Sequence, residues 1–154
     1  MTGNEATSHY RKPGWFTKHV FNQAVAGLTG LGVSVWGSRV LEVRGRTSGE
    51  PRRTPVNLLT VADATYLVSP RGETQWVRNV RAAGGNLDLL LGRRRTRYVA
   101  AEVPDADKVP LLRAYLQRWK AEVGVFFDGV GPDAPDEAIA AVAHKHPVFR
   151  LAER

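Results

Sequence analysis

Short runs of alternating apolar and polar residues, joined by tight turns, constrain the fold of this chain more than any other feature. The alternation predicts five strands, at 39–44, 53–61, 64–69, 87–91 and 96–103. The second and third are separated only by Ala62–Asp63, and the last two only by Gly92–Arg93–Arg94. Strands joined by turns this short pair antiparallel. The sheet is therefore expected to be built from antiparallel hairpins.

Helical periodicity fills the stretches between the hairpins. Apolar residues three or four positions apart predict helices at about 15–30, 74–83, 107–120 and 133–144, and a strand at 148–151 ends the chain. Asp107 and Asp133 are the expected N-caps of the last two helices. Pro55 lacks an N–H, so its strand should lie at an edge or carry a bulge there. The order predicts an α+β domain on a curved or closed sheet and disfavours a Rossmann fold.

A length of 154 residues predicts one domain, with a flexible tail over residues 1–14 and a single folded unit over 15–154. The absence of cysteine excludes disulfides, thiolate catalysis and cysteine-ligated metals. No apolar run approaches the roughly 20 residues of a membrane span. We expect a cytoplasmic protein. Trp15 and Phe16, beside Lys18 on the first helix, allow peripheral contact with the inner face of the plasma membrane as an alternative.

The segment between the first two predicted strands is typical of an anion site. It contains the hydroxyls of Thr47 and Ser48 together with glycines and arginines. Glycines let backbone N–H groups converge on an anion, and each arginine can donate two parallel hydrogen bonds to it. The net charge of +7 is concentrated nearby, since residues 44–97 hold eleven arginines and four carboxylates. Such charge suits nucleic acid, an anionic membrane or a small polyanion. A solvated hairpin turn is the alternative interpretation.

Residue constellations that perform hard chemistry are not found in the sequence. The histidines, His9, His19, His144 and His146, lack metal-ligand spacing and are expected at the surface. No nucleophile elbow surrounds Ser48 or Ser69. The acidic residues of the strand region are scattered along the sequence, at Glu42, Asp63, Glu73 and Asp88. A bound cofactor is therefore the expected source of reactivity, with no metal and no assigned catalytic side chain.

Two segments in a fixed order carry a resemblance to a known family. GRTSGEPRRTPVN at 45–57 and SPRGETQWVRNVRAAG at 69–84 resemble the deazaflavin-dependent nitroreductase family of actinobacteria, and the resemblance runs from about 40 to 119. It implies a split β-barrel of the pyridoxamine-phosphate-oxidase-like type that binds coenzyme F420. That cofactor is an 8-hydroxy-5-deazaflavin whose tail carries a phosphate and several glutamates, and FMN is the alternative cofactor.

The resemblance also implies which residues bind the cofactor. The first segment would hold the tail phosphate, and the second would border the deazaflavin ring, with Trp76 as a wall of the ring pocket. The family usually has lysine at Thr47, so arginines must supply that charge here. The implied residues are Arg46, Thr47, Ser48, Gly49, Arg52, Arg53, Thr54, Pro55, Ser69, Pro70, Arg71, Gly72, Trp76, Arg78 and Asn79.

The implied activity is transfer of a hydride from F420H2 to a small electrophilic acceptor, namely an activated alkene, a quinone or a nitroaromatic. Asn57 stands where the family commonly has tyrosine, and the C-terminal aromatic segment supplies Phe126 and Phe127 without hydroxyls. The chain is expected to act as a monomer or homodimer. A split-barrel protein that binds F420, FMN or haem without an external substrate is the alternative. A nucleic-acid module is disfavoured because the strands lack a ladder of exposed aromatic residues.

Overall fold

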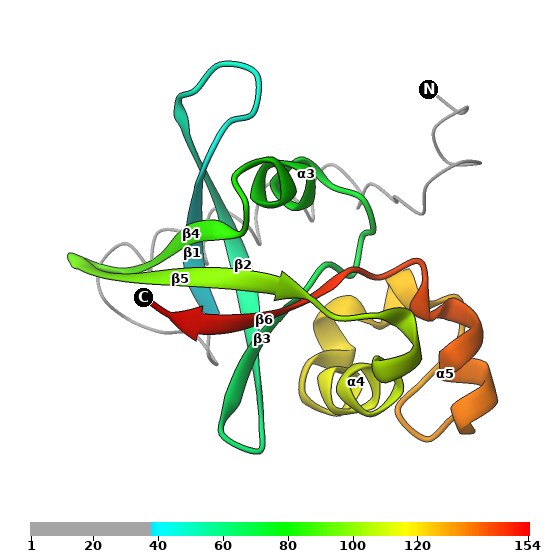
Figure 1. Cartoon of the computed structure of the whole chain (residues 1–154). Helices are drawn as coiled ribbons and strands as arrows, with labels where there is room; N and C mark the ends of the chain where they lie inside the picture. The colour runs from blue at the N-terminus through cyan, green and yellow to red at the C-terminus, as the bar shows by residue number, and fades with distance from the viewer. Residues whose placement is uncertain (1–37) are drawn as a thin grey trace.

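The computed structural model describes residues 38–154, and their six strands close into an antiparallel barrel (Figure 1). The strands pair in the order β1, β2, β3, β6, β5, β4, and β4 pairs back to β1. The barrel confirms the prediction of a curved or closed antiparallel sheet and the split-barrel class. Their bounds are β1 (Ser38–Arg44), β2 (Pro51–Val61), β3 (Ala64–Val68), β4 (Asn86–Leu91), β5 (Arg94–Glu102) and β6 (Val148–Glu153).

Three α-helices and two short 3-10 helices complete the described part of the chain. They are α3 (Gln75–Ala82), η1 (Asp105–Asp107), α4 (Val109–Val123), η2 (Gly124–Phe127) and α5 (Asp136–Ala143). Helix α3 lies at one end of the barrel, while α4 and α5 pack together against its side (Figure 1). The predicted tail and N-terminal helix, with its aromatic residues, lie outside the described residues.

Strand β2 changes partner along its length, and this explains how a proline fits inside it. Its first half pairs with β1, where Pro55 faces Val40, and pairing with β3 begins only at Leu58. Among residues 38–154, Pro55 therefore has strand β1 on one side and no strand on the other. The expectation of an edge position at Pro55 is confirmed, and the register is continuous through it.

The sheet buries side chains on both faces. The barrel interior is closed at one end by Val77 and Val80 of α3. On the outside, α4 and α5 cover one region of the sheet, where the indole N–H of Trp119 donates to the carbonyl of Leu58 at 3.0 Å. Burial of this apolar surface is the main stabilising contribution to both clusters. The interior cluster contains Leu41, Val43, Val56, Leu67, Val77, Val80, Leu87, Leu89, Phe149 and Leu151.

Both predicted aspartate N-caps are wrong. Asp107 lies in η1, and the N-cap position of α4 is Lys108, which is buried. The Lys108 ammonium pairs with Asp105 at 2.7 Å and donates to the carbonyl of Ala143 at 3.1 Å. These bonds draw the chain into a tight turn before α4. Asp133 was expected to be the N-cap of α5, but the helix begins at Asp136 and its N-cap position is Pro135.

The segment 124–131, predicted as a loop, begins with the 3-10 helix η2. Phe126 and Phe127 are both buried there, in the cluster beneath α4 and α5. Both rings therefore form part of the core. The reason is packing: Phe127 lies against Tyr115, with ring centroids 6.3 Å apart, and fills the space between the helices.

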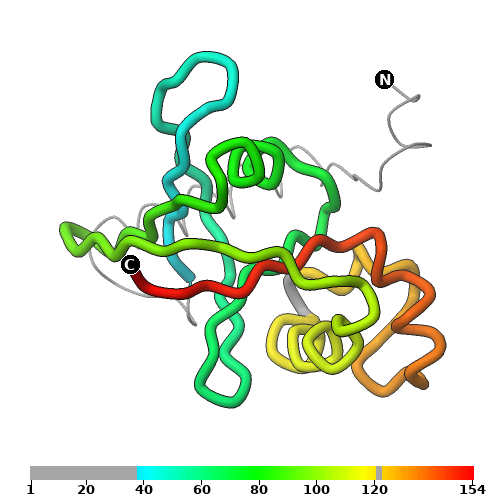
Figure 2. The backbone as a smooth tube through the Cα atoms, in the orientation of Figure 1, coloured from blue at the N-terminus to red at the C-terminus, as the bar shows by residue number. Residues whose placement is uncertain are grey.

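The C-terminal end of α3 is fixed against β5 by a glycine. Gly85 has a φ of +87°, and a Cβ at this position would lie 2.3 Å from the carbonyl oxygen of Ala100. The amide of Gly85 donates to Val80 at 2.9 Å, and the amide of Ala100 donates to Gly85 at 2.8 Å. Only glycine permits this approach. The contact holds α3 beside the hairpin of β1 and β2, which extends past the end of the barrel (Figure 2).

Candidate functional site

The loop between β1 and β2 is a compact turn with outward-facing donors. The amide of Gly45 donates to Glu50 at 2.8 Å, and that of Gly49, whose φ is +76°, donates to Gly45 at 2.9 Å. The Ser48 hydroxyl accepts from the amide of Glu50 at 3.1 Å. Within residues 38–154, the N–H groups of Thr47 and Ser48 donate to no other atom. The exposed loop therefore presents two amides and two hydroxyls to solvent.

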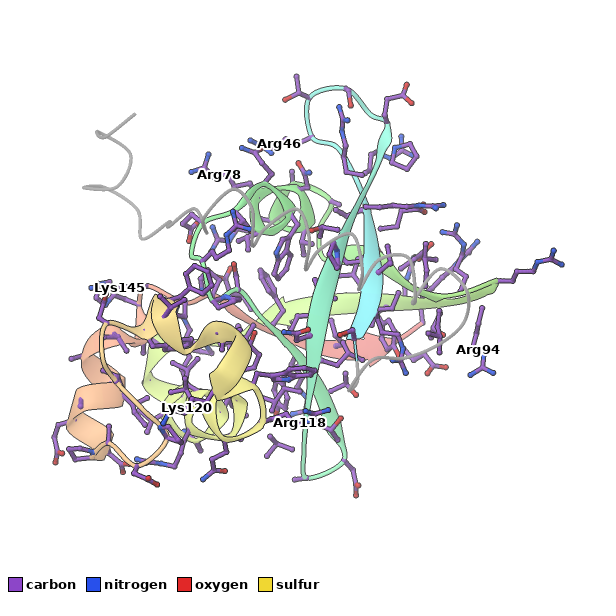
Figure 3. The ribbon with its side chains drawn as sticks, turned by 180° about the vertical axis from the view of Figure 1, so that it is seen from behind. Arg46, Arg78, Arg94, Arg118, Lys120 and Lys145 are labelled. Atoms are coloured by element: carbon purple, nitrogen blue, oxygen red, sulfur yellow. The ribbon has the colours of Figure 1, made fainter. Side chains whose placement is uncertain are left out.

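Asn79 joins this loop to α3. Its side chain is buried, and its amide oxygen accepts from the backbone N–H of Arg46 at 3.1 Å and from the Arg46 guanidinium at 2.8 Å. Arg78, the preceding residue, is exposed and lies close to Arg46 (Figure 3). The two sequence segments are thus in direct contact, and they place three arginines, Arg46, Arg52 and Arg78, around one loop.

Arg52 and Arg53 lie on opposite faces of the β1–β2 ladder. Arg52 faces Val43, whose side chain points into the barrel, and its guanidinium donates to the Ser48 hydroxyl at 3.3 Å. Arg53 faces Glu42 on the outer face, and donates to that carboxylate at 2.8 Å. Strand alternation forces this separation. Thr54 shares the inner face with Arg52, and Pro55 shares the outer face with Arg53.

Glu42 and Asp88, scattered in the sequence, are adjacent across β1 and β4. Both carboxylates bind the guanidinium of Arg95, at 2.6 Å and 2.5 Å, and Glu42 also binds Arg53. The hydrogen bond from Arg95 is the largest influence on the Glu42 carboxyl and lowers its pKa, an effect that burial opposes and Arg53 reinforces. These two carboxylates are therefore distant in the sequence but belong to one ion-pair network in the fold.

The lowered pKa of Glu42 predicts an acid-sensitive contribution to stability. A carboxyl with a lowered pKa stabilises the fold above the ordinary glutamate value, about 4.3, and loses that contribution as pH falls through its folded-state pKa. We expect the difference in unfolding free energy between the native chain and Glu42→Gln to be constant near neutrality and to shrink below about pH 4.3. Urea titrations between neutral and acid pH measure it. A difference that grows on acidification would contradict the assignment.

The turn between β3 and α3 is held from beneath. Ser69 is fully buried, and its hydroxyl donates to the carbonyl of Gly72 at 2.6 Å. Gly72 has a φ of +93°, which suits glycine alone. The Pro70 carbonyl lies 2.9 Å from Nδ1 of His146, whose ring stacks on Phe127 at 3.9 Å. His146 is therefore buried, which corrects its predicted surface location; His144 is exposed as predicted.

Because the Ser69 hydroxyl is buried and engaged, it shapes the turn. Ser69→Ala removes one of two donors to the carbonyl of Gly72, which also accepts from the amide of Thr74 at 2.8 Å, and we expect a loss of about 1 kcal/mol in unfolding free energy. Chemical denaturation measures the loss. Ser48→Ala, at an exposed hydroxyl, is the matched control and should lose less than about 0.5 kcal/mol. Equal losses would contradict a structural role for Ser69.

The remaining predicted residues lie near these elements. Trp76 is half-buried in the first turn of α3 and packs on Phe149, with ring centroids 5.9 Å apart. Arg71 is half-buried in the turn before α3. Among the tyrosines, Tyr115 is core, while Tyr98 is half-buried beside the interior cluster. Burial, and secondarily Glu153, raise the pKa of Tyr98, so its hydroxyl stays protonated at neutral pH.

Arg81 is a site-supporting residue that the sequence pattern did not single out. Its guanidinium binds Glu73, in the turn before α3, at 2.5 and 3.1 Å, and Glu102, at the end of β5, at 2.6 and 2.9 Å. These two carboxylates raise its pKa. Glu73 lies eight residues before Arg81, outside the i,i+3 and i,i+4 spacings of helical ion pairs, and Glu102 is distant in sequence, so neither contact had a local signal. The contacts of Asn79 and Arg81 within α3, and of Gly85 just after it, thus hold this helix in place.

Residues 38–154 were searched for metal-binding groups and for membrane-spanning helices. They contain no group of three or more side chains suited to hold a metal ion. None of their helices has the length and apolar character needed to cross a bilayer.

Residues 15–128, most of the chain, match the F420H(2)-dependent quinone reductase family. A search of curated protein sequences found no match.

Solved structures share the fold at low sequence identity. An F420-H2 dependent reductase superposes with a TM-score of 0.52 at 15% identity, over 75% of this chain and 94% of that one. A conserved hypothetical protein from Mycobacterium tuberculosis gives 0.51 at 17% identity, over 76% and 72%. A structure described as a domain-swapped dimer gives 0.55 at 15% identity, over 89% and 94%. These likenesses support the barrel architecture.

Proposed function

The chain belongs to the F420H2-dependent quinone reductase family, and from this premise we propose that it transfers a hydride from F420H2 to a quinone. F420 is the cofactor of the family and the chain is an F420-dependent reductase; the choice of a quinone over an activated alkene or a nitroaromatic is our proposal. The family match supports the quinone as acceptor, and the contact between Asn79 and Arg46 supports one shared cofactor site, because it joins the two segments proposed to bind F420.

The donors at the β1–β2 loop fit the phosphate of F420. Phosphate is recognised by backbone N–H groups, hydroxyls and arginine, and the loop offers all three through Thr47, Ser48 and Arg52. Arg46 and Arg78 extend the positive charge along α3, where the glutamates of the tail would bind. We propose that Gly49 shapes the loop and that Arg53, on the outer face, supports the ladder through Glu42.

The ring end of the cofactor is assigned to the N-terminal part of α3. The turn from Ser69 to Gly72 and the indole of Trp76 would border it, one helical turn from Asn79. Thr54 faces the same side as Arg52 and could contact the cofactor between the two ends, whereas Pro55 lies on the other face. Ser69 and Asn79 have their polar groups engaged, so we assign them to shaping the site.

Bound F420H2 supplies the hydride, and the protein fixes where the acceptor meets it. The turn from Ser69 to Gly72, whose Pro70 carbonyl contacts His146, would hold the ring of bound F420 in place. Holding donor and acceptor at near-attack distance, with water excluded, lowers the barrier to hydride transfer. We propose that Trp76 forms one wall of that space, since its ring is half-buried and supported by Phe149.

The purified chain tests the proposal directly. We expect F420 to bind at micromolar or lower dissociation constant in a fluorescence titration, and FMN to bind more weakly. Mixed with F420H2, the protein should oxidise it faster with a soluble naphthoquinone than with cyclohexenone or a nitroimidazole. Preferential binding of FMN would overturn the cofactor assignment here. F420 binding without turnover of any acceptor would favour a binding protein instead of a reductase.

A further inference from the structure

The helices at the side of the barrel meet the turn between β3 and α3 at one buried histidine. His146 lies between the end of α5 and the start of β6, and its side chain is fully buried. Its Nδ1 atom lies 2.9 Å from the carbonyl oxygen of Pro70, and the amide of Ser69 donates to the carbonyl of Pro147 at 2.9 Å. The segment that leads from α5 into β6 therefore runs beside this turn and is bonded to it (Figure 1).

The contact with Pro70 determines where the imidazole of His146 carries its proton. A carbonyl oxygen only accepts hydrogen bonds, so Nδ1 must be the protonated nitrogen. The ring stacks on Phe127, with centroids 3.9 Å apart and planes 20° from parallel. Both side chains are fully buried. Stacking therefore fixes the plane of the imidazole, and the plane directs the Nδ1–H group at the turn.

Three helical elements together set the position of this donor. Phe127 belongs to η2 and packs against Tyr115 of α4, with ring centroids 6.3 Å apart. Lys145, the residue before His146, follows α5 and pairs with Asp128, just after η2, at 2.9 Å. The donor to Pro70 is thus part of the packed helices, although the turn that receives it belongs to the barrel.

We propose that His146 is a positioning residue for hydride transfer, because its bond to Pro70 sets where the turn between β3 and α3 meets the ring of bound F420. The inference rests on the proposed function, which assigns the ring to this turn. It adds a residue that lies in neither cofactor segment and that acts through the backbone of Pro70.

The expected effect is on the rate of hydride transfer, not on F420 affinity. Misplacing reacting groups by about 1 Å can slow a reaction about a hundredfold. The phosphate end of F420 is assigned to the β1–β2 loop, whose bonds run to Asn79 of α3 instead. Loss of the His146 donor should therefore shift the ring end and leave the phosphate end bound.

Two substitutions of His146 separate the hydrogen bond from the packing. His146→Phe keeps an aromatic ring against Phe127 without a donor, whereas His146→Asn places an amide N–H near the position of Nδ1. In single turnovers of bound F420H2 with a soluble naphthoquinone, we expect the rate to fall about ten- to a hundredfold in His146→Phe and about fivefold or less in His146→Asn. The exposed His144→Phe is the control and should stay within about twofold of the native rate.

Nitrogen-15 NMR of the native chain with labelled histidine tests the hydrogen bond without any turnover. The His146 signals, identified by their loss in either variant, should show a protonated Nδ1 that exchanges slowly with solvent. An imidazole protonated only at Nε2 would overturn the inference even if neither variant folds.

The turnover results separate this inference from the proposed function. A native chain that binds F420 but transfers no hydride to the naphthoquinone contradicts the proposed function, and the inference falls with it. Native turnover with a full rate in His146→Phe, or with equal losses in His146→Phe and His146→Asn, overturns the inference alone. An F420 dissociation constant that rises as much as the rate falls would mean general damage, so the constant should stay within about threefold of the native value.

Discussion

Replacing Arg52 by alanine should weaken F420 binding about ten- to a hundredfold, whereas Arg53→Ala should change it by less than about threefold. The two residues are adjacent and carry equal charge, but only Arg52 shares a face with Ser48 and the α3 side of the loop. A hydrogen bond to a charged group contributes about 1.5–3 kcal/mol, which sets the larger effect. Arg53 is directed at Glu42 instead.

Isothermal titration with F420 measures both dissociation constants. Because each single variant removes one positive charge, each is the control for the effect of net charge in the other. The Arg52→Ala/Arg53→Ala double variant should bind no more weakly than Arg52→Ala within about threefold. Unchanged affinity in the double variant would remove the loop from the phosphate site. A loss at Arg53 as large as that at Arg52 would mean that both faces of the ladder reach the ligand.

The strands could be predicted from the sequence because their signal is local. Alternation at Leu41 and Val43, and the turn at Ala62–Asp63, where both φ values are positive, depend on neighbouring residues alone. Closure of the barrel, by contrast, depends on β4 pairing with β1 across some fifty residues. Short-range patterns suggest a curved sheet, and only the register of distant strands decides that it closes.

The prediction of Asp107 as an N-cap and the prediction of His146 at the surface were wrong for the same reason. Asp107 had the right chemistry for a cap, but Lys108 is drawn inward by Asp105 and by the carbonyl of Ala143, which belongs to a helix far along the chain. His146 is buried because Phe127 and Pro70 surround its ring. In each case a tertiary contact overrides the local preference.

The residues of the candidate site could be proposed from the sequence, but which of them would contact the ligand and which support their neighbours could not. Sequence motifs cannot distinguish a side chain that meets a ligand from one that holds its neighbour. The burial of Ser69 and Asn79, and the bonds that their polar groups make, supply that distinction. The role of Arg81 in linking Glu73 to Glu102 likewise depends on how β5 passes α3.

Asn79→Ala is expected to lower both stability and F420 affinity, because it removes an amide oxygen that joins the β1–β2 loop to α3 through two hydrogen bonds. The backbone N–H and the guanidinium of Arg46 would both lose their partner, at a cost of about 1–3 kcal/mol in unfolding free energy. With the loop no longer fixed, we expect the dissociation constant for F420 to rise about tenfold or more. Denaturant titration and F420 fluorescence measure the two effects.

Two further variants separate the link from general damage to the helix. Asn86→Ala removes an exposed amide that donates to Ala83 just beyond α3, and should leave F420 affinity within about twofold. Asn79→Asp keeps an acceptor for Arg46, so it should restore stability relative to Asn79→Ala, while its negative charge beside the phosphate donors keeps F420 binding weak. Stability restored with affinity still low is the signature of a residue that shapes the loop and borders an anion site. Native affinity in Asn79→Ala would show that the loop and α3 act independently.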